Sequence, residues 1–236
     1  MNTDAPQLAR KLAGKFIVFD GPDGCGKGTQ IRMLEKALAE GGGRVVRGKD
    51  PGGTHIGDRI RSVLLDYDLS EMDVRCETLL FMASRAQLVG QVVEPAIAKG
   101  RTVLCDRFVS ATCAYQGAQG YDIRRVIEVA PYAIGDCWPH LTVILNVDVE
   151  TGFARTGRKT HHVGKHRRKY AGQPKLFDGA QPDAMEARPI EFHRKVREIF
   201  LQLGKVYPRP VVVIDGRADS EAVHAKVLEA LAGADL

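Results

Sequence analysis

Residues 16–30 read FIVFDGPDGCGKGTQ, and this segment restricts the possible folds of the chain more than any other. An apolar run predicts a buried strand, glycines follow it, and apolar residues at helical spacing predict a helix. The spacing Gly21-x4-Gly26-Lys27 is typical of a phosphate-binding loop, in which glycines let backbone N–H groups turn toward a phosphate. The segment therefore predicts binding of a nucleoside triphosphate. The alternative is an ordinary turn between a strand and a helix.

The loop departs from the usual pattern at one position. The Ser or Thr that usually follows the lysine and holds Mg²⁺ is Gly28 here, and Thr29 comes one residue late. We expect the whole loop to contact the triphosphate, and its residues are Gly21, Pro22, Asp23, Gly24, Cys25, Gly26, Lys27, Gly28 and Thr29.

Apolar runs and helical patterns alternate along the chain. Strands are predicted at 15–19, 44–47, 102–105, 141–147 and 211–214. Helices are predicted at about 27–40, 57–66, 71–99, 122–134, 150–158, 186–206 and 219–232. Three of the strand runs are nearly continuous in Val, Ile, Leu and Phe, as expected when helices cover both faces of a parallel sheet. The alternation predicts an α/β fold with an open, doubly wound, five-stranded parallel sheet.

Composition excludes several classes of protein. No run of 18 apolar residues could span a membrane, and residues 1–15 lack the apolar stretch of a signal peptide. The five scattered cysteines include no C-x-x-C pair, which indicates reduced thiols and a cytoplasmic protein. The net charge of +5 is local, because residues 155–175 hold eight Lys and Arg and no acid, and the remaining chain would carry −3.

The chain shows no internal repeat and no linker, so we expect one domain over 1–236. Residues 1–14 are predicted to be a partly ordered tail. Residues 155–183 are rich in charge, Gly and Pro, and they are predicted to form a basic lid loop.

Ligands of such folds lie beyond the carboxyl ends of the strands, where polar side chains follow three of the predicted strands. Asp106 and Arg107 follow residues 102–105; the acid can hold Mg²⁺ or its waters, and the guanidinium can clamp phosphate oxygens. A structural Asp–Arg pair is the alternative.

Phe81 and Arg85 lie four residues apart on a predicted helix, where one can stack on a flat heterocycle and the other can bond its edge. Taken alone, the two residues favour a structural interpretation, with Phe81 in the core and Arg85 on the surface.

The motifs together resemble thymidylate kinases, which phosphorylate dTMP with ATP. Besides the loop, the matching text is Asp50-Pro51-Gly52-Gly53-Thr54, Leu80-Phe81-x-x-x-Arg85-Ala86-Gln87, Asp106-Arg107-Phe108 and Ala114-Tyr115-Gln116-Gly117. The resemblance covers residues 15–30, 49–66, 77–88, 102–117, 146–155 and 186–232. It implies a P-loop kinase fold, a homodimer, and ATP with Mg²⁺ as the phosphoryl donor.

The resemblance also implies residue roles. Lys27 would hold the β- and γ-phosphates of ATP, Asp23 would contact the sugar 3′-hydroxyl or the metal, and Arg107 would hold the dTMP phosphate. Tyr115 would crowd the sugar 2′ position, and Arg155 would lie near the adenine. The implied dTMP contacts are Asp23, Asp50, Phe81, Arg85, Arg107, Thr112, Tyr115 and Gln116. The implied metal residues are Asp23, Asp106 and Glu186.

The chain differs from the family pattern in ways that shift positive charge. The loop carries Gly24-Cys25 and no arginine, and Ala184 stands where the family has an arginine. Basic residues of the predicted lid would then supply the charge, with Lys165, Arg167, Arg168 and Lys169 as candidates.

Two other functions stay open on the residues alone. The chain could be a nucleoside monophosphate kinase with another or broader base preference, since an apolar pocket discriminates a methyl group only weakly. It could also be a catalytically silent P-loop protein that binds nucleic acid through residues 155–175. Tyr170 is the one aromatic residue in that stretch, so nucleic acid is not the expected partner.

Overall fold

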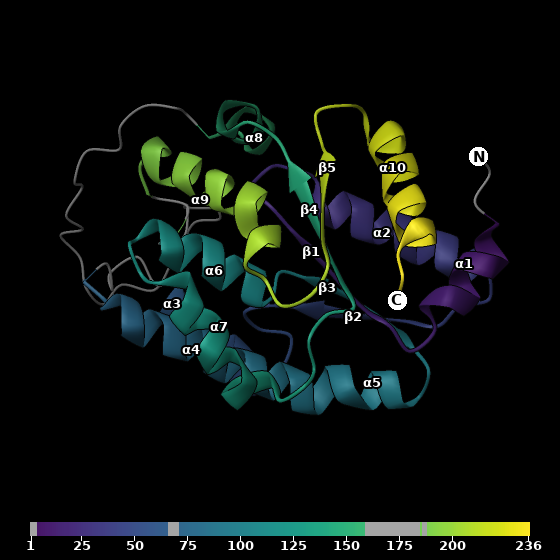
Figure 1. The fold of residues 1–236 in the computed structure, drawn as a ribbon, viewed down its shortest axis with the longest axis horizontal. Helices are drawn as coiled ribbons and strands as arrows, with labels where there is room; N and C mark the ends of the chain where they lie inside the picture. The colour runs from purple at the N-terminus through teal and green to yellow at the C-terminus, as the bar shows by residue number, and fades with distance from the viewer. Residues whose placement is uncertain (1–3, 66–70, 159–184, 186–187) are drawn as a thin grey trace, which may run out of the picture.

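Five parallel strands form one sheet in a computed structural model that describes residues 4–65, 71–158, 185 and 188–236 (Figure 1). The strand order is β2 (Val45–Lys49), β3 (Thr102–Asp106), β1 (Phe16–Asp20), β4 (Leu141–Asn146) and β5 (Val211–Asp215). The predicted five-stranded parallel sheet is therefore confirmed, with each strand within two residues of its expected bounds. Whether residues 1–236 form one domain stays a prediction.

The register brings the ends of three strands together. Phe19 of β1 and Lys49 of β2 both pair with Asp106 of β3. The chain segments that leave β1, β2 and β3 therefore start side by side, at the edge where the sequence predicts ligands.

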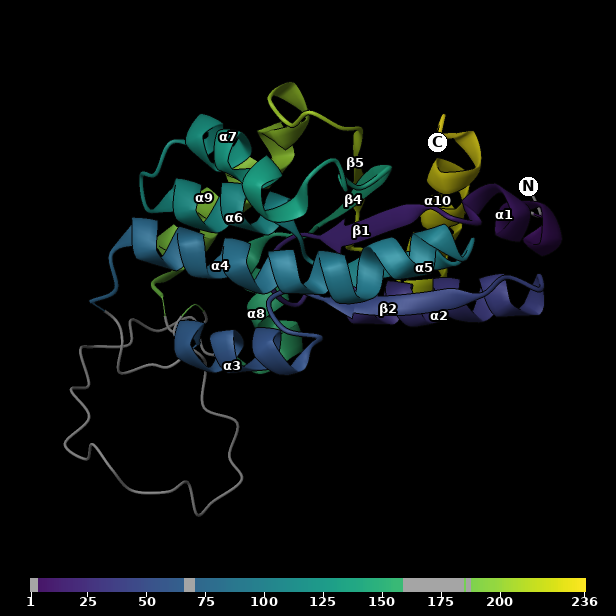
Figure 2. The same cartoon turned by 90° about the horizontal axis from the view of Figure 1, so that it is seen from below.

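Helices cover both faces of the sheet (Figures 1 and 2). Side chains of β1 alternate between two cores: Phe16 and Val18 pack toward α4, α6 and α7, whereas Ile17 and Phe19 pack toward α1, α2 and α10. The helical elements are α1 (Ala5–Leu12), α2 (Lys27–Glu40), α3 (His55–Leu64), α4 (Val74–Leu88), the π-helical turn η2 (Val89–Val93), α5 (Glu94–Ala98), α6 (Val109–Ala118), α7 (Ile123–Ile134), α8 (Val149–Thr156), α9 (Ile190–Gln202), the 3-10 turn η3 (Leu203–Lys205) and α10 (Ser220–Gly233).

The prediction of a partly ordered tail over residues 1–14 is wrong for residues 5–12. They form α1, which buries Leu8, Ala9 and Leu12 against α2 and α10. The apolar stripe of this short helix lies on one face only. The sequence of α1 therefore contains no continuous apolar run, which is the feature that identifies a signal peptide. The helix nevertheless packs against the core through its apolar face.

Helix α6 was missing from the predicted helices for a different reason. Every residue from Val109 to Gln116 is buried. A helix that is buried all round has no polar face, so it shows no 3.6-residue periodicity in its sequence. Its location could be found only from the tertiary structure.

Across the residues that the structure describes, none of the helices has the length and apolarity needed to cross a bilayer.

We predict that Leu12→Ala lowers the free energy of unfolding by about 2–4 kcal/mol, because Leu12 is fully buried and its loss leaves a cavity. Urea denaturation at constant m-value would measure the change. Gln7→Ala, at an exposed position of the same helix, is the matched control and should change the stability by less than about 0.5 kcal/mol. Equal small effects of both substitutions would mean that α1 does not stabilise the fold.

Candidate active site

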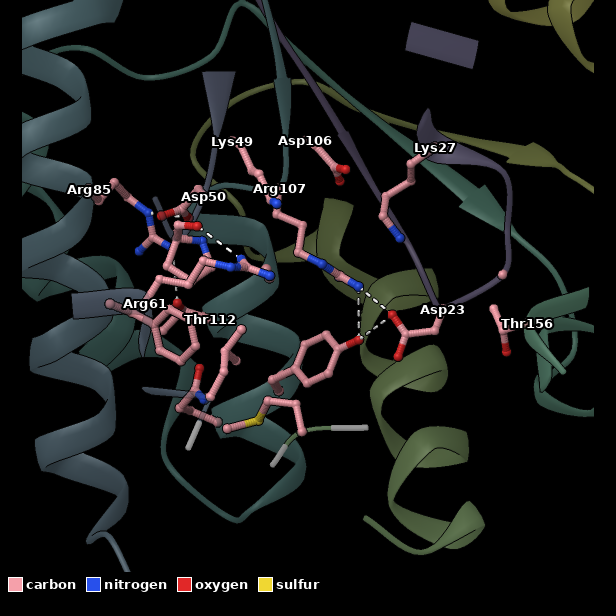
Figure 3. A pocket seen from close by; sticks show the side chains of 18 residues that line it. Asp23, Lys27, Lys49, Asp50, Arg61, Arg85, Asp106, Arg107, Thr112 and Thr156 are labelled. Carbon is pink, nitrogen blue, oxygen red and sulfur yellow. Dashed lines mark hydrogen bonds and ion pairs between the residues drawn. The ribbon is translucent and has the colours of Figure 1, made fainter. Parts of the chain in front are cut away.

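A cavity of about 320 Å³ opens at the carboxyl ends of β1, β2 and β3 (Figure 3). The phosphate loop, the β2–α3 segment, β3 and helices α4 and α6 each contribute side chains. Its lining residues are Asp23, Gly24, Lys27, Lys49, Asp50, Pro51, Arg61, Leu65, Phe81, Arg85, Asp106, Arg107, Ala111, Thr112, Tyr115, Gln116, Thr156 and Met185.

The glycines of the phosphate loop are required by its backbone. Gly21, Gly24 and Gly26 have φ values of 132°, 72° and 97°, which side chains rarely tolerate. A Cβ at Gly21 would overlap the carbonyl oxygen of Leu145, and a Cβ at Gly24 would overlap that of Gly152. The loop can therefore take this path against β4 and α8 only with glycine at these positions.

Lys27 begins α2, and its ammonium group folds back over the loop. Nζ donates to the carbonyl oxygens of Gly21 and Pro22, both at 3.2 Å. The Cys25 side chain is buried beneath it, and burial raises the pKa of this thiol. Cys25 is therefore a neutral packing residue of the loop.

The other loop residues named by the sequence do not line this cavity. Gly21, Pro22, Cys25, Gly26, Gly28 and Thr29 are absent from the lining. The Thr29 hydroxyl accepts a hydrogen bond from Arg32 Nη2 at 3.1 Å, and Gly28 has no hydroxyl. The first turn of α2 thus directs no free hydroxyl into the cavity.

Arg107 connects the end of β3 to the phosphate loop. Its Nη1 donates to Asp20 Oδ1 at 3.0 Å, and its Nη2 donates to Asp23 Oδ1 at 2.7 Å and to the Tyr115 hydroxyl at 3.1 Å. Its φ of 69° is positive, the one such case outside glycine among the described residues. A strained backbone of this kind persists where surrounding contacts hold it, and it is common at functional sites.

Asp23 lies among cations. Burial alone would raise its pKa, but the charges of Arg107, Lys27 and Arg158 outweigh burial and hold the pKa below its ordinary value. Arg158 Nη1 lies 3.4 Å from Asp23 Oδ2. Arg158 follows α8 at the start of the predicted lid. Its guanidinium therefore places a positive charge beside the phosphate loop, which has no arginine of its own. The sequence reasoning did not single out Arg158.

Arg85 and Asp50 form a fully buried ion pair at the other side of the cavity. The guanidinium donates to Asp50 Oδ2 through Nε, at 2.9 Å, and through Nη2. Nη2 also donates to the carbonyl oxygen of Phe108 and to Thr112 Oγ1. The reading of Arg85 as a surface residue is therefore wrong, because Asp50 supplies the charge that lets it be buried.

The predicted base-contacting residues meet at this side. Phe81 and Arg85 share a face of α4, and Thr112 and Gln116 share a face of α6. All four line the cavity, which brings an aromatic ring, a planar donor and two polar side chains to one location.

The remaining predicted residues fall in three situations. Asp106 lines the cavity, and its Oδ1 is buried without a hydrogen-bond partner among the described residues. Arg155 does not line the cavity; it donates to the carbonyl oxygens of Gly216 and Arg217 at 3.0 and 3.1 Å, beyond β5. Glu186 and the lid cations Lys165, Arg167, Arg168 and Lys169 lie outside the described residues.

Sequence reasoning also missed Arg61, which lines the cavity from α3 and donates to the Pro51 carbonyl oxygen at 3.0 Å. The helical pattern at 57–66 located Arg61 on a helix. Nothing in that pattern says which face meets the ends of the strands.

The profile of the thymidylate kinase family matches residues 19–227, a range that includes every residue lining the cavity. The thymidylate kinase of Citrifermentans bemidjiense is 38% identical over 219 residues, 92% of this chain and 91% of the relative. That of Deinococcus radiodurans is 36% identical over 92% of this chain and 96% of the relative. The crystal structure of thymidylate kinase from Ehrlichia chaffeensis superposes with a TM-score of 0.68 at 28% identity, covering 93% of this chain and 99% of that chain.

We predict that Asp50→Ala lowers the free energy of unfolding by about 3 kcal/mol, because it leaves the Arg85 guanidinium buried without its carboxylate. Urea denaturation would measure the loss. Glu35→Ala removes the carboxylate of an exposed ion pair with Arg47 and should cost less than about 1 kcal/mol. A loss below about 1 kcal/mol for Asp50→Ala would show that Arg85 does not need the pair.

Proposed function

Because the chain belongs to the thymidylate kinase family, we propose that the cavity at the ends of β1, β2 and β3 is its site of phosphoryl transfer. The chain is an ATP-dependent dTMP kinase, and its reaction gives dTDP and ADP. Family membership favours this reading over a silent nucleic-acid-binding protein. One observation supports the proposed site most directly: Lys27, at the start of α2, and Arg107, after β3, line the same cavity, and Asp23 beside them accepts a hydrogen bond from Arg107.

The proposed phosphate contacts follow from charge. Lys27 would hold the β- and γ-phosphates of ATP, and Arg107 would hold the dTMP phosphate. Phosphoryl transfer needs two phosphates in line and cations where charge develops, and it needs no nucleophilic side chain here because the dTMP oxygen is already anionic. We propose that Arg158 adds the third cation, which its approach to Asp23 supports.

The proposed nucleoside contacts lie on α4 and α6. Phe81 would stack on thymine, and Arg85 and Thr112 would bond its edge. Tyr115 would crowd the 2′ position of the sugar, a role that its packing against Arg107 supports, because that contact holds the ring in place. Asp23 would accept a hydrogen bond from the 3′-hydroxyl. For Arg155, the bonds to the segment after β5 support a position near the adenine.

We also propose that the site binds Mg²⁺. Asp106 fits as a ligand because its buried Oδ1 has no protein partner among the described residues, and Mg²⁺ prefers carboxylate oxygens, water and phosphate. No three His, Cys, Asp or Glu side chains gather into a ligand set within the described ranges, so water and phosphate oxygens would complete the shell. When bound, the metal neutralises charge on the transferred phosphate.

We propose further that the chain forms a homodimer in the cytoplasm. Leu79 of α4 and Tyr132 of α7 are 59% and 93% exposed, and these two helices pack together, so they offer apolar side chains to a second copy. All five cysteines, each within the described ranges, are free thiols, which suits a reducing compartment.

Incubation with ATP, Mg²⁺ and each nucleoside monophosphate tests the activity and the base preference together. We expect the highest kcat/KM for dTMP. Lys27→Ala should stay folded by circular dichroism and lose turnover, because the substitution removes the ammonium group that would hold the ATP phosphates. Better use of another monophosphate would contradict the dTMP preference, and near wild-type turnover of Lys27→Ala would contradict the loop assignment.

We predict that Arg107→Ala lowers kcat/KM for dTMP at least about 100-fold, the scale of losing a preorganised charge stabiliser. Steady-state kinetics would measure the loss, with the thermal midpoint recorded in parallel. Arg47→Ala removes an arginine from an exposed ion pair and should leave kcat/KM unchanged. A loss of tenfold or less for Arg107→Ala would make this residue structural.

A further inference from the structure

One face of α4 carries a second polar residue besides Arg85, and this residue is Glu77. Glu77, Phe81 and Arg85 follow one another at intervals of four residues, so they lie on successive turns of the same face. Glu77 is buried at 3% exposure and does not line the cavity. The sequence assigns it no role, and a buried carboxylate needs donors around it.

Hydrogen-bond donors surround the Glu77 carboxylate. Oε2 accepts from Gln116 Nε2 at 3.0 Å and from Gln119 Nε2 at 2.5 Å. Oε1 lies 3.8 Å from Nη2 of Arg188. A carboxylate among such partners acts only as an acceptor.

This arrangement decides the orientation of the Gln116 side-chain amide. An amide has a donor end and an acceptor end, and only the donor end can meet Glu77. The oxygen, Gln116 Oε1, is therefore turned away from Glu77. It is buried and has no hydrogen-bond partner among the described residues, although Gln116 lines the cavity. A ligand that brings a hydrogen-bond donor to such a buried acceptor binds more favourably, because the new hydrogen bond satisfies the acceptor.

We propose that Glu77 is a positioning residue that holds the Gln116 amide with its oxygen toward the nucleobase. The inference rests on the proposed function of the cavity. An acceptor at this location suits a base with a ring N–H on its edge, as in thymine and uracil. It leaves an unsatisfied pair of acceptors with cytosine, whose corresponding ring nitrogen carries a lone pair.

Arg85 completes the same discrimination. Its Nη1 has the sulfur of Met82 as a partner at 3.3 Å, and sulfur is a weak acceptor. This donor suits the carbonyl oxygen that thymine and uracil carry beside the ring N–H, and it opposes the amino group of cytosine. The pocket thus presents one donor and one acceptor, and Glu77 determines the second of them.

Glu77→Gln tests the proposal, because the introduced glutamine is isosteric and can also donate, which lets the Gln116 amide turn over. We expect the ratio of kcat/KM for dTMP to that for dCMP to fall at least about tenfold. The ratio for dTMP to dUMP should stay within about twofold, because these bases share the same edge and differ at a methyl group. If the role of Glu77 were merely structural, Glu77→Gln would lower kcat/KM for all three substrates by the same factor. Both ratios would then stay unchanged, and this result would overturn the proposal.

Two further variants separate positioning from stability. Gln119→Leu removes the other amide donor to Glu77, and because Gln119 does not line the cavity it should keep the wild-type ratios. Gln116→Leu should lower the dTMP to dCMP ratio, and adding Glu77→Gln to it should change that ratio no further. If Glu77→Gln fails to fold, Gln116→Leu decides alone, and a wild-type ratio in it would overturn the proposal. A wild-type protein inactive on dTMP would instead overturn the proposed function, and this inference with it.

Discussion

The guanidinium of Arg107 is the contact on which the arrangement of the cavity depends. It reaches from the end of β3 to Asp20 and Asp23, on either side of the first glycine of the phosphate loop. The backbone N–H of Arg107 also extends the sheet by donating to the Phe19 carbonyl oxygen at 2.9 Å. The backbone of Arg107 is left-handed, and the four polar partners of its guanidinium, Asp20, the Gly21 carbonyl oxygen, Asp23 and Tyr115, compensate for that strain.

The cavity has two electrostatic regions that different packing holds apart. In one, Lys27, Arg107 and Arg158 gather around Asp23 at the end of β1. In the other, Arg85 is neutralised by Asp50 inside the protein, where burial raises the pKa of Asp50 and the Arg85 charge opposes that rise. The first region suits phosphate groups, and the second suits an uncharged heterocycle, because its own charges are already paired.

Much of the fold followed from local patterns, and the exceptions share a physical cause. Three of the five strands stood out because nearly continuous runs of Val, Ile, Leu and Phe are typical of strands that are buried on both faces of a parallel sheet. The other two were located by their shorter apolar runs between helical patterns. Helix α6 was not predictable because burial on every side removes the periodicity on which such predictions rely. Helix α1 was missed because it has few apolar residues. Leu8, Ala9 and Leu12 are recognised as core residues only when the tertiary structure shows them packed against α2 and α10.

By itself, the sequence determined that this chain has a phosphate-binding loop, a parallel sheet, and polar residues at the ends of three strands. These properties depend on residue type and short-range spacing. The tertiary structure alone decided which distant side chains meet: Asp50 with Arg85, Arg158 with Asp23, and Glu77 with Gln116. Each of these contacts joins segments at least 35 residues apart. Spacing along a chain says nothing about such meetings, because the packing of helices on the sheet sets them.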